Sequence, residues 1–177
     1  MSDKFKKEIL EWAKTILVAF ALAFLITQFV RPTIVDGQSM YPTLDHKDYL
    51  LINRMSYKFG EPKKGDIIVF STDLKLDNGK TKDLVKRVIA VEGDHIKIKD
   101  SNVYINDKLT EEPYIAESYT NGDIDIVIPK DKMFTMGDNR ENSKDSRMED
   151  VGLVDEADVM GKVMVRLFPF NKIGTVK

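Results

Sequence analysis

The sequence contains no cysteine, which excludes a catalytic thiol, a zinc–thiolate site and a disulfide scaffold. Histidine occurs only as His46 and His95, too few for a histidine-rich metal site, and no metal or other cofactor is expected. Basic residues are not in excess either. With 27 Lys and Arg against 29 Asp and Glu, the formal net charge is −2, so we expect no nucleic-acid partner. The remaining composition, 42% hydrophobic and 32% charged, excludes a disordered tail and a polytopic membrane protein.

Charged residues are missing from residues 15–30, a stretch of sixteen predominantly apolar residues. As an α-helix this stretch would span about 24 Å, slightly less than the ~30 Å hydrocarbon core of a bilayer. Lys14 can extend its ammonium group to the lipid headgroups and Trp12 can lie at the same level, which makes up the difference. The stretch therefore predicts an anchor in a lipid bilayer.

The distribution of basic residues predicts the orientation of this anchor. Only Arg31 follows it closely, whereas four lysines precede it: Lys4, Lys6, Lys7 and Lys14. Basic residues that flank a membrane span favour the cytoplasmic side. We therefore expect a cytoplasmic tail over 1–14, a single-pass anchor in the cell membrane over 15–30, and an extracytoplasmic domain over 31–177.

A cleavable signal peptide and a buried core helix are the two alternatives for residues 15–30. A signal peptide needs small residues directly after its apolar part, but the sequence QFVR follows at 28–31. Ala19, Ala21 and Ala23 have the A-x-A spacing, yet they lie in the middle of the apolar stretch, where a peptidase could not reach them. An uncleaved anchor fits these features best.

Residues 31–177 carry the patterns of β-strands. Apolar runs or alternating apolar residues of strand length occur in a series of segments: 67–70, 84–91, 96–98, 103–105, 124–128, 133–136 and 159–168. Asn106 and Asp107 suit a turn after the fourth of these. The stretches 37–48 and 137–152 are rich in small polar residues, Gly or Pro and are predicted to be loops. We predict a mainly β fold, an antiparallel barrel-like domain on a single N-terminal transmembrane helix.

Ser39 is the first candidate for catalytic chemistry. Gly37 permits a sharp turn two residues before it, and Pro42 restricts Tyr41 to an extended conformation, so the serine would be held on a stiff loop. Most loop serines, however, only bond to nearby backbone groups. The local sequence therefore leaves both a nucleophile and a structural serine open.

Lys86 and Arg87 lie inside the apolar run 84–91, where two cations are costly unless each has a function or a partner. Strand alternation places Lys86 on one face with Leu84 and Val88, and Arg87 on the other. Arg87 cannot lose its proton and needs an acidic partner. Lys86 can lose its proton, because burial lowers a lysine pKa, and a neutral amine is a competent general base for a serine hydroxyl. The alternative is a lysine at a strand edge whose ammonium group reaches water.

The polar segment 137–147 is the third candidate. A calcium loop is excluded by its pattern, because the EF-hand order of ligands is absent and basic residues interrupt the acidic ones. A hydrogen-bonded scaffold fits better. In such a scaffold Asp138 or Asp145 would pair with Arg87, and Ser143 would be available to orient the lysine amine.

Together with the N-terminal anchor, these segments resemble the type I bacterial signal peptidases, which remove signal peptides at the membrane surface with a serine–lysine dyad. Four motifs carry the resemblance: SMYPTL at 39–44, GDIIVF at 65–70, KRVI at 86–89 and GDNRENSKDSR at 137–147. They stand in the family's order, and the resemblance covers nearly the whole chain. The small number of residues between Gly93 and Met133 is similar to the short Gram-positive members.

The resemblance implies a membrane-bound serine endopeptidase that acts on precursor proteins bearing signal peptides and uses no cofactor. Residue by residue, it implies that Ser39 is the nucleophile and Lys86 the general base. Ser143 would position the lysine, and Met40 would lie beside the site near the bilayer. Four charged residues would hold the catalytic core together: Arg87, Asp138, Asp145 and Arg147.

Two features depart from the family's pattern. Ala90 and Glu92 replace a Gly and a Pro of the usual K-R-V-I-G-x-P-G-D sequence, although Gly93 remains for the turn. Gly37 stands where some members carry a serine whose hydroxyl completes the oxyanion hole. The backbone N–H of Ser39 is then the only donor that the sequence identifies, and loss of one such donor can cost ~2.7–4 kcal/mol of transition-state stabilisation.

Three other functions fit less well. The self-cleaving repressors use the same dyad on a similar β fold, but they predict an N-terminal DNA-binding domain in place of residues 1–30. A Ser-His-Asp hydrolase would need His46 or His95, and both have the sequence surroundings of surface histidines. A catalytically silent, membrane-tethered binding module has no need for both Ser39 and Lys86.

Overall fold

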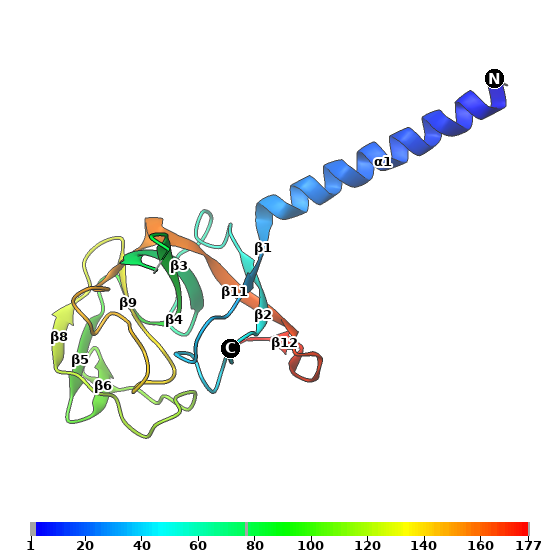
Figure 1. The fold of residues 1–177 in the computed structure, drawn as a ribbon. Helices are drawn as coiled ribbons and strands as arrows, with labels where there is room; N and C mark the ends of the chain where they lie inside the picture. The colour runs from blue at the N-terminus through cyan, green and yellow to red at the C-terminus, as the bar shows by residue number, and fades with distance from the viewer. Residues whose placement is uncertain (1–2, 77, 177) are drawn as a thin grey trace.

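The computed structural model describes residues 3–76 and 78–176, in which one helix projects from a β domain (Figure 1). Residues 1 and 2 of the predicted tail and residues 77 and 177 of the predicted domain lie outside this description. Helix α1 runs without interruption from Asp3 to Phe29, so the described part of the predicted tail and nearly all of the predicted anchor form one helix.

Helix α1 exposes its apolar side chains. The segment Lys6–Phe29 has the length and the mean hydropathy, 2.0, of a helix able to cross a membrane, and none of it is buried against the rest of the chain. Leu17 and Phe20 are among its large apolar side chains that face outward. The helix is therefore not packed as the core helix of a soluble domain would be, and that alternative is wrong for this structure.

Eight strands form the main sheet, in which all pairings are antiparallel. Their spatial order is β1-β2-β11-β3-β4-β9-β10, and β12 pairs with β11. The strands are Val30–Ile34 (β1), Tyr49–Asn53 (β2), Ile67–Lys75 (β3), Thr81–Val91 (β4), Lys132–Met136 (β9), Val154–Asp155 (β10), Val159–Phe168 (β11) and Gly174–Thr175 (β12). Because β4 lies between β3 and β9, Lys86 and Arg87 occupy the interior of this sheet.

A second, four-stranded antiparallel sheet lies on the other side of the domain from α1 (Figure 1). Its order is β7-β6-β5-β8, with strands His95–Lys99 (β5), Asn102–Ile105 (β6), Lys108–Leu109 (β7) and Ile124–Val127 (β8). Asn106 and Asp107 turn between β6 and β7 with φ of 52° and 63°, as a type I′ hairpin requires. Two 3₁₀ helices, Glu156–Asp158 (η1) and Phe170–Lys172 (η2), complete the elements. The predicted mainly β, antiparallel fold with an N-terminal apolar helix is confirmed.

Three clusters of buried apolar residues hold the β domain together. Neighbouring residues of β3 contribute to different clusters, since alternate side chains leave a strand on opposite faces: Ile67 and Val69 join one, Ile68 and Phe70 another. The cluster that contains Ile67 and Val69 also contains Met40 from the loop after β1. The core therefore anchors the loop that carries Ser39.

Candidate active site

Ser39 lies in the loop after β1, in the wall of a cleft of about 420 Å³. The next residue, Met40, and Leu44 are buried in the core, and the Leu44 N–H donates to the Met40 carbonyl oxygen at 2.8 Å. Gly37 has a φ of 102°, in the left-handed region that glycine adopts at little cost. This turn and its core contacts hold Ser39, which is half-buried, beside the cleft.

Lys86 lies in the middle of β4 and only 2% of its surface is exposed. Alternation along the strand places it between Leu84 and Val88, which are both buried. Its Nζ lies 2.7 Å from the Oγ of Ser39 and donates to the carbonyl oxygen of Val85 at 2.9 Å. The structure thus brings Ser39 and Lys86 together, although they lie 47 residues apart in the sequence.

Burial lowers the pKa of Lys86 to about 8; the carboxylates of Asp145 and Asp138 oppose this decrease, and the cations Lys82 and Arg147 add to it. At the ordinary lysine pKa of ~10.4, about one amine in two thousand is neutral at pH 7. At a pKa of about 8, the neutral fraction is roughly a tenth. A neutral amine at hydrogen-bond distance from a serine hydroxyl can accept its proton, which is the step that activates a serine nucleophile.

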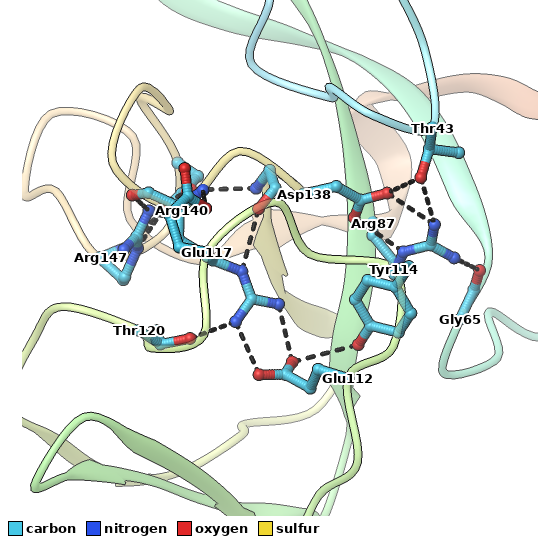
Figure 2. Close-up of polar contacts among 12 residues, drawn as sticks. Thr43, Gly65, Arg87, Glu112, Tyr114, Glu117, Thr120, Asp138, Arg140 and Arg147 are labelled. Carbon is cyan, nitrogen blue, oxygen red and sulfur yellow. Dashed lines mark hydrogen bonds and ion pairs between the residues drawn. The ribbon is translucent and has the colours of Figure 1, made fainter.

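Arg87 faces the other side of β4 and forms a buried, bidentate ion pair with Asp138 (Figure 2). Its Nε and Nη2 donate to the two carboxylate oxygens at 2.8 and 2.7 Å, and the two side chains are 3% and 0% exposed. The Thr43 hydroxyl donates to the same carboxylate at 2.5 Å, and the ring of Tyr114 lies 4.0 Å from the Arg87 guanidinium carbon. Of the two acids expected as partners of Arg87, the structure selects Asp138. This pair joins β4 to the loops of Ser39 and Ser143.

Asp145 pairs instead with Arg147. The Nε and Nη2 of Arg147 donate to its carboxylate oxygens at 2.8 and 2.9 Å, and the Gly137 N–H donates to it at 3.0 Å. Burial alone would raise the pKa of Asp145, but the Arg147 guanidinium and the Gly137 N–H outweigh burial and lower it. Asp145 is therefore a carboxylate at neutral pH.

Gly137 packs directly against the backbone of Ser39 and the side chain of Ser143. A Cβ atom at Gly137 would collide with the Ser143 Oγ and the Ser39 carbonyl oxygen, so glycine is required there for close packing. Ser143 Oγ is buried without a hydrogen-bond partner of normal geometry among the described residues, yet it is near enough to the Asp145 carboxylate to help lower its pKa. Ser143 makes no hydrogen bond to Lys86 here, and its expected part in orienting the amine stays a prediction.

Arg140 is a buried residue of the site that the sequence did not single out, with 2% of its surface exposed. Its Nη1 and Nη2 each donate to the Glu112 carboxylate at 2.7 Å, and Nη1 also donates to the Thr120 hydroxyl (Figure 2). Residues 112–120 therefore lie as a strap across the loop 137–147. Position within the motif at 137–147 was the only sequence signal for Arg140, and residues 112–120 carry no pattern that identifies Glu112.

Neither histidine reaches Ser39. His46 accepts a hydrogen bond from the Gly37 N–H at 3.2 Å, and His95 Nε2 lies 2.6 Å from Asp125 Oδ1 on the second sheet. A Ser-His-Asp triad is thus not formed with Ser39. Among residues 3–76 and 78–176, no group of three or more His, Asp or Glu side chains is placed to hold a metal ion.

The whole chain, and not only the site, is similar to known proteins. A family model described as "Signal peptidase, peptidase S26" matches residues 9–168. The chain is 39% identical to signal peptidase IB of Staphylococcus aureus, over 94% of this chain and 93% of that protein. It is 38% identical to signal peptidase I S of Bacillus subtilis, over 95% and 94%.

Among solved structures, a signal peptidase I from Enterococcus faecalis is 29% identical, with a TM-score of 0.48 over 58% of this chain and 96% of that one. The sequence matches carry the assignment, because they span nearly the full length of both chains. They confirm the resemblance based on the four motifs. The chain belongs to the peptidase S26 family of type I signal peptidases, hydrolases that cleave signal peptides.

Proposed function

We propose that the chain is a membrane-anchored serine endopeptidase that removes N-terminal signal peptides from exported precursor proteins, with Ser39 as the nucleophile and Lys86 as the general base. The 2.7 Å distance between Lys86 Nζ and Ser39 Oγ, in the wall of an open cleft, is the observation that carries this proposal. Acyl transfer needs a nucleophile with an adjacent base, and these two groups supply both.

The geometry supports a two-step reaction. The neutral Lys86 amine takes the hydroxyl proton as Ser39 Oγ attacks the scissile carbonyl carbon. The resulting ammonium group gives that proton to the departing amine of the mature protein, and the signal peptide remains as an ester on Ser39. Lys86 then takes a proton from a water molecule whose oxygen attacks the ester carbonyl carbon. As the bond to Ser39 Oγ breaks, the Lys86 ammonium group returns that proton to Oγ, and the signal peptide leaves as a carboxylic acid. The Ser39 N–H donates to no other described group and is the oxyanion donor in this proposal.

The proposed supporting roles rest on contacts. The pair Arg87–Asp138 joins β4 to the loop 137–147, and the pair Asp145–Arg147 fixes the conformation of that loop. Met40 fastens that loop in the core. The remaining polar side chain of the set, Ser143, is proposed to position Lys86 when substrate is bound.

Cleavage of a synthetic precursor tests the proposed function. Purified full-length protein in detergent should cut a precursor peptide after an A-x-A sequence. Ser39→Ala should reduce kcat/KM by at least about 10⁴-fold, because no nucleophile remains. Mass spectrometry of the products gives the site and rate of cleavage. Equal cleavage by wild type and Ser39→Ala would contradict Ser39 as the nucleophile, and no cleavage by wild type would favour a silent binding module.

We also propose that α1 spans the bilayer with its N-terminus in the cytoplasm, as the lysine distribution favours. The Arg54 N–H donates to the Phe29 carbonyl oxygen at 2.9 Å, which ties the end of the helix to the end of β2. From there β1, five residues or about 17 Å long, leads into the loop of Ser39. The cleft would therefore lie near the membrane surface, where a precursor's own apolar segment emerges.

Removal of the anchor is expected to affect membrane-borne and soluble substrates differently. A chain that begins at residue 31 should cut a full precursor in vesicles about tenfold or more slowly, because enzyme and substrate no longer share one bilayer. A short soluble peptide should be cut at nearly the same rate by both forms, which controls for folding. Protease outside intact cells should also digest 31–177 and spare the tail. A mature form that begins at residue 31 in cells would contradict the anchor.

A further inference from the structure

His46 contacts the segment that carries the nucleophile. Its Nδ1 lies 3.2 Å from the backbone nitrogen of Gly37 and accepts the Gly37 N–H. Gly37 lies two residues before Ser39 and lines the same cleft. We propose that His46 is a positioning residue for the reaction: its unprotonated Nδ1 fixes Gly37, and through Gly37 the cleft wall and the Ser39 hydroxyl. This inference rests on the proposed function, since it assigns His46 a role relative to the Ser39 nucleophile.

The backbone on either side of the turn is held by other hydrogen bonds. Upstream, Val35 pairs with the backbone of residues 47–48 through hydrogen bonds of 2.9 and 2.8 Å. Downstream, Asn139 donates to the carbonyl oxygens of residues 38–39 at 3.2 and 3.1 Å. Between these fixed points, within the described part of the chain, the bond to the histidine is the one hydrogen bond that restrains the backbone of residues 36–37.

Packing does not restrain Gly37, which makes this hydrogen bond important. Gly37 is exposed, and beyond its chain neighbours no heavy atom lies within 4 Å of the place where a Cβ would be. Glycine also has more backbone freedom than any other residue. Loss of the contact with His46 therefore frees the cleft wall directly before the nucleophile.

Protonation of His46 breaks its hydrogen bond with Gly37. An imidazolium carries a hydrogen on both ring nitrogens, so it cannot accept the Gly37 N–H. Asp36 Oδ1 lies 3.5 Å from the same Nδ1 and would become its partner, and the side chain of His46 is 45% exposed, so protons reach it from solvent. Charged residues also adjoin His46 in the sequence, namely Asp45, Lys47 and Asp48; of these, Asp48 pairs with Arg166 and Asp45 with Lys172.

The exchange of partners predicts a loss of activity at low pH in addition to the one caused by Lys86. Protonation of Lys86 lowers the rate of every variant that keeps the dyad, so the ratio between two such variants cancels its effect. The ratio between wild type and a His46 variant therefore isolates the contribution of this residue.

Three full-length variants in detergent provide the test, with a peptide substrate that has no group titrating between about pH 5 and pH 9. His46→Asn keeps an acceptor oxygen near the position of Nδ1 but does not titrate. His46→Ala removes the acceptor. His95→Asn is the matched control, because His95 lies on the second sheet in a surface ion pair with Asp125. Urea unfolding midpoints of all variants should match that of wild type, since both histidines lie at the surface.

The expected result is that the pH curve of wild type joins that of His46→Asn at alkaline pH and that of His46→Ala at acid pH. At about pH 9, wild type and His46→Asn should have similar kcat/KM, and His46→Ala should be about threefold to tenfold lower, the range of one net hydrogen bond. At acid pH, where the His46 imidazole carries a second proton, wild type should fall to the curve of His46→Ala, whereas His46→Asn stays above it by the same factor. His95→Asn should follow wild type throughout.

Two outcomes overturn the inference alone. One is a wild-type curve parallel to that of His46→Asn over the whole range; the other is equal kcat/KM for His46→Ala and His46→Asn at every pH. In both cases wild type would still cleave and Ser39→Ala would not, so the proposed function would stand. Absence of cleavage that depends on Ser39 would overturn the proposed function, and this inference with it.

Discussion

Replacement of Lys86 by arginine should abolish cleavage, with kcat/KM reduced by at least about 10⁴-fold despite the retained positive charge. A guanidinium group stays protonated near neutral pH and cannot take the proton of the Ser39 hydroxyl. Lys86→Met should be equally inactive, because Ser39 and Lys86 act in one proton-transfer unit in the proposed mechanism. The measurement is cleavage of the synthetic precursor, with circular dichroism as a check that each variant folds.

The pH dependence of kcat/KM in wild type is a second test of the role of Lys86. Because only the neutral amine is a base, kcat/KM should rise with pH and level off above the Lys86 pKa of about 8. Below that value, log kcat/KM should fall by about one unit per pH unit until other groups titrate. An inflection near the ordinary lysine value of ~10.4 would mean that the amine is not desolvated in the working enzyme.

Lys99→Arg is the matched control for these variants. Lys99 is an exposed lysine of β5, in the second sheet, that does not line the cleft, and its replacement should leave kcat/KM unchanged. A Lys86→Arg enzyme with activity close to that of Lys99→Arg would contradict the mechanism. It would show that position 86 needs only a charge and that Lys86 is not the general base.

The strands that cross the core could be predicted because burial imposes a pattern on their sequence. The run 159–168 coincides with β11, and the run 84–91 lies within β4. The run 67–70 covers only the first part of β3, since residues 71–75 are mostly polar and lie at the surface. Helix α1 likewise extends well before the charge-free stretch. Polar residues that continue an element into solvent leave no periodic signal, so its ends could not be predicted.

Lys86 and Arg87 could be identified from the sequence because burial of a charged side chain in an apolar strand costs free energy. A lysine and an arginine inside an apolar strand require an explanation, and the structure gives each its own: Lys86 contacts Ser39, and Arg87 pairs with Asp138. The choice between Asp138 and Asp145 as the partner of Arg87 was not encoded locally. It depends on Arg147, which lies close enough to Asp145 to occupy both carboxylate oxygens.

The strap over residues 137–147 could not be predicted at all. Its ion pair joins Glu112 to Arg140, 28 residues later, and both lie in irregular segments. Irregular backbone has no period from which the direction of a side chain can be inferred, so no local pattern distinguishes Glu112 from its exposed neighbour Glu111. Such contacts are determined by the packed fold.

Replacement of Asp138 by asparagine should destabilise the fold by about 3–5 kcal/mol, although the two side chains have nearly the same shape. The change leaves the Arg87 guanidinium, which is 3% exposed, without the charge that compensates its burial. It also weakens the acceptor of the Thr43 hydroxyl, which links the Ser39 loop to residues 137–147. Urea unfolding of the full chain in detergent, followed by circular dichroism, measures the loss. Activity should fall as well under conditions where the variant is folded.

Two further variants distinguish the cost of leaving a charge buried from the cost of losing any ion pair. Lys132 and Asp155 are joined at the same 2.7 Å distance, but their side chains are 35% and 48% exposed. Asp155→Asn should therefore cost no more than about 1 kcal/mol. The double variant Arg87→Met/Asp138→Leu should be more stable than Asp138→Asn, because it removes both charges of this buried pair, and should still lack full activity. If Asp138→Asn cost no more than Asp155→Asn, the Arg87 charge would have to be reaching solvent, and the pair would not hold the site together.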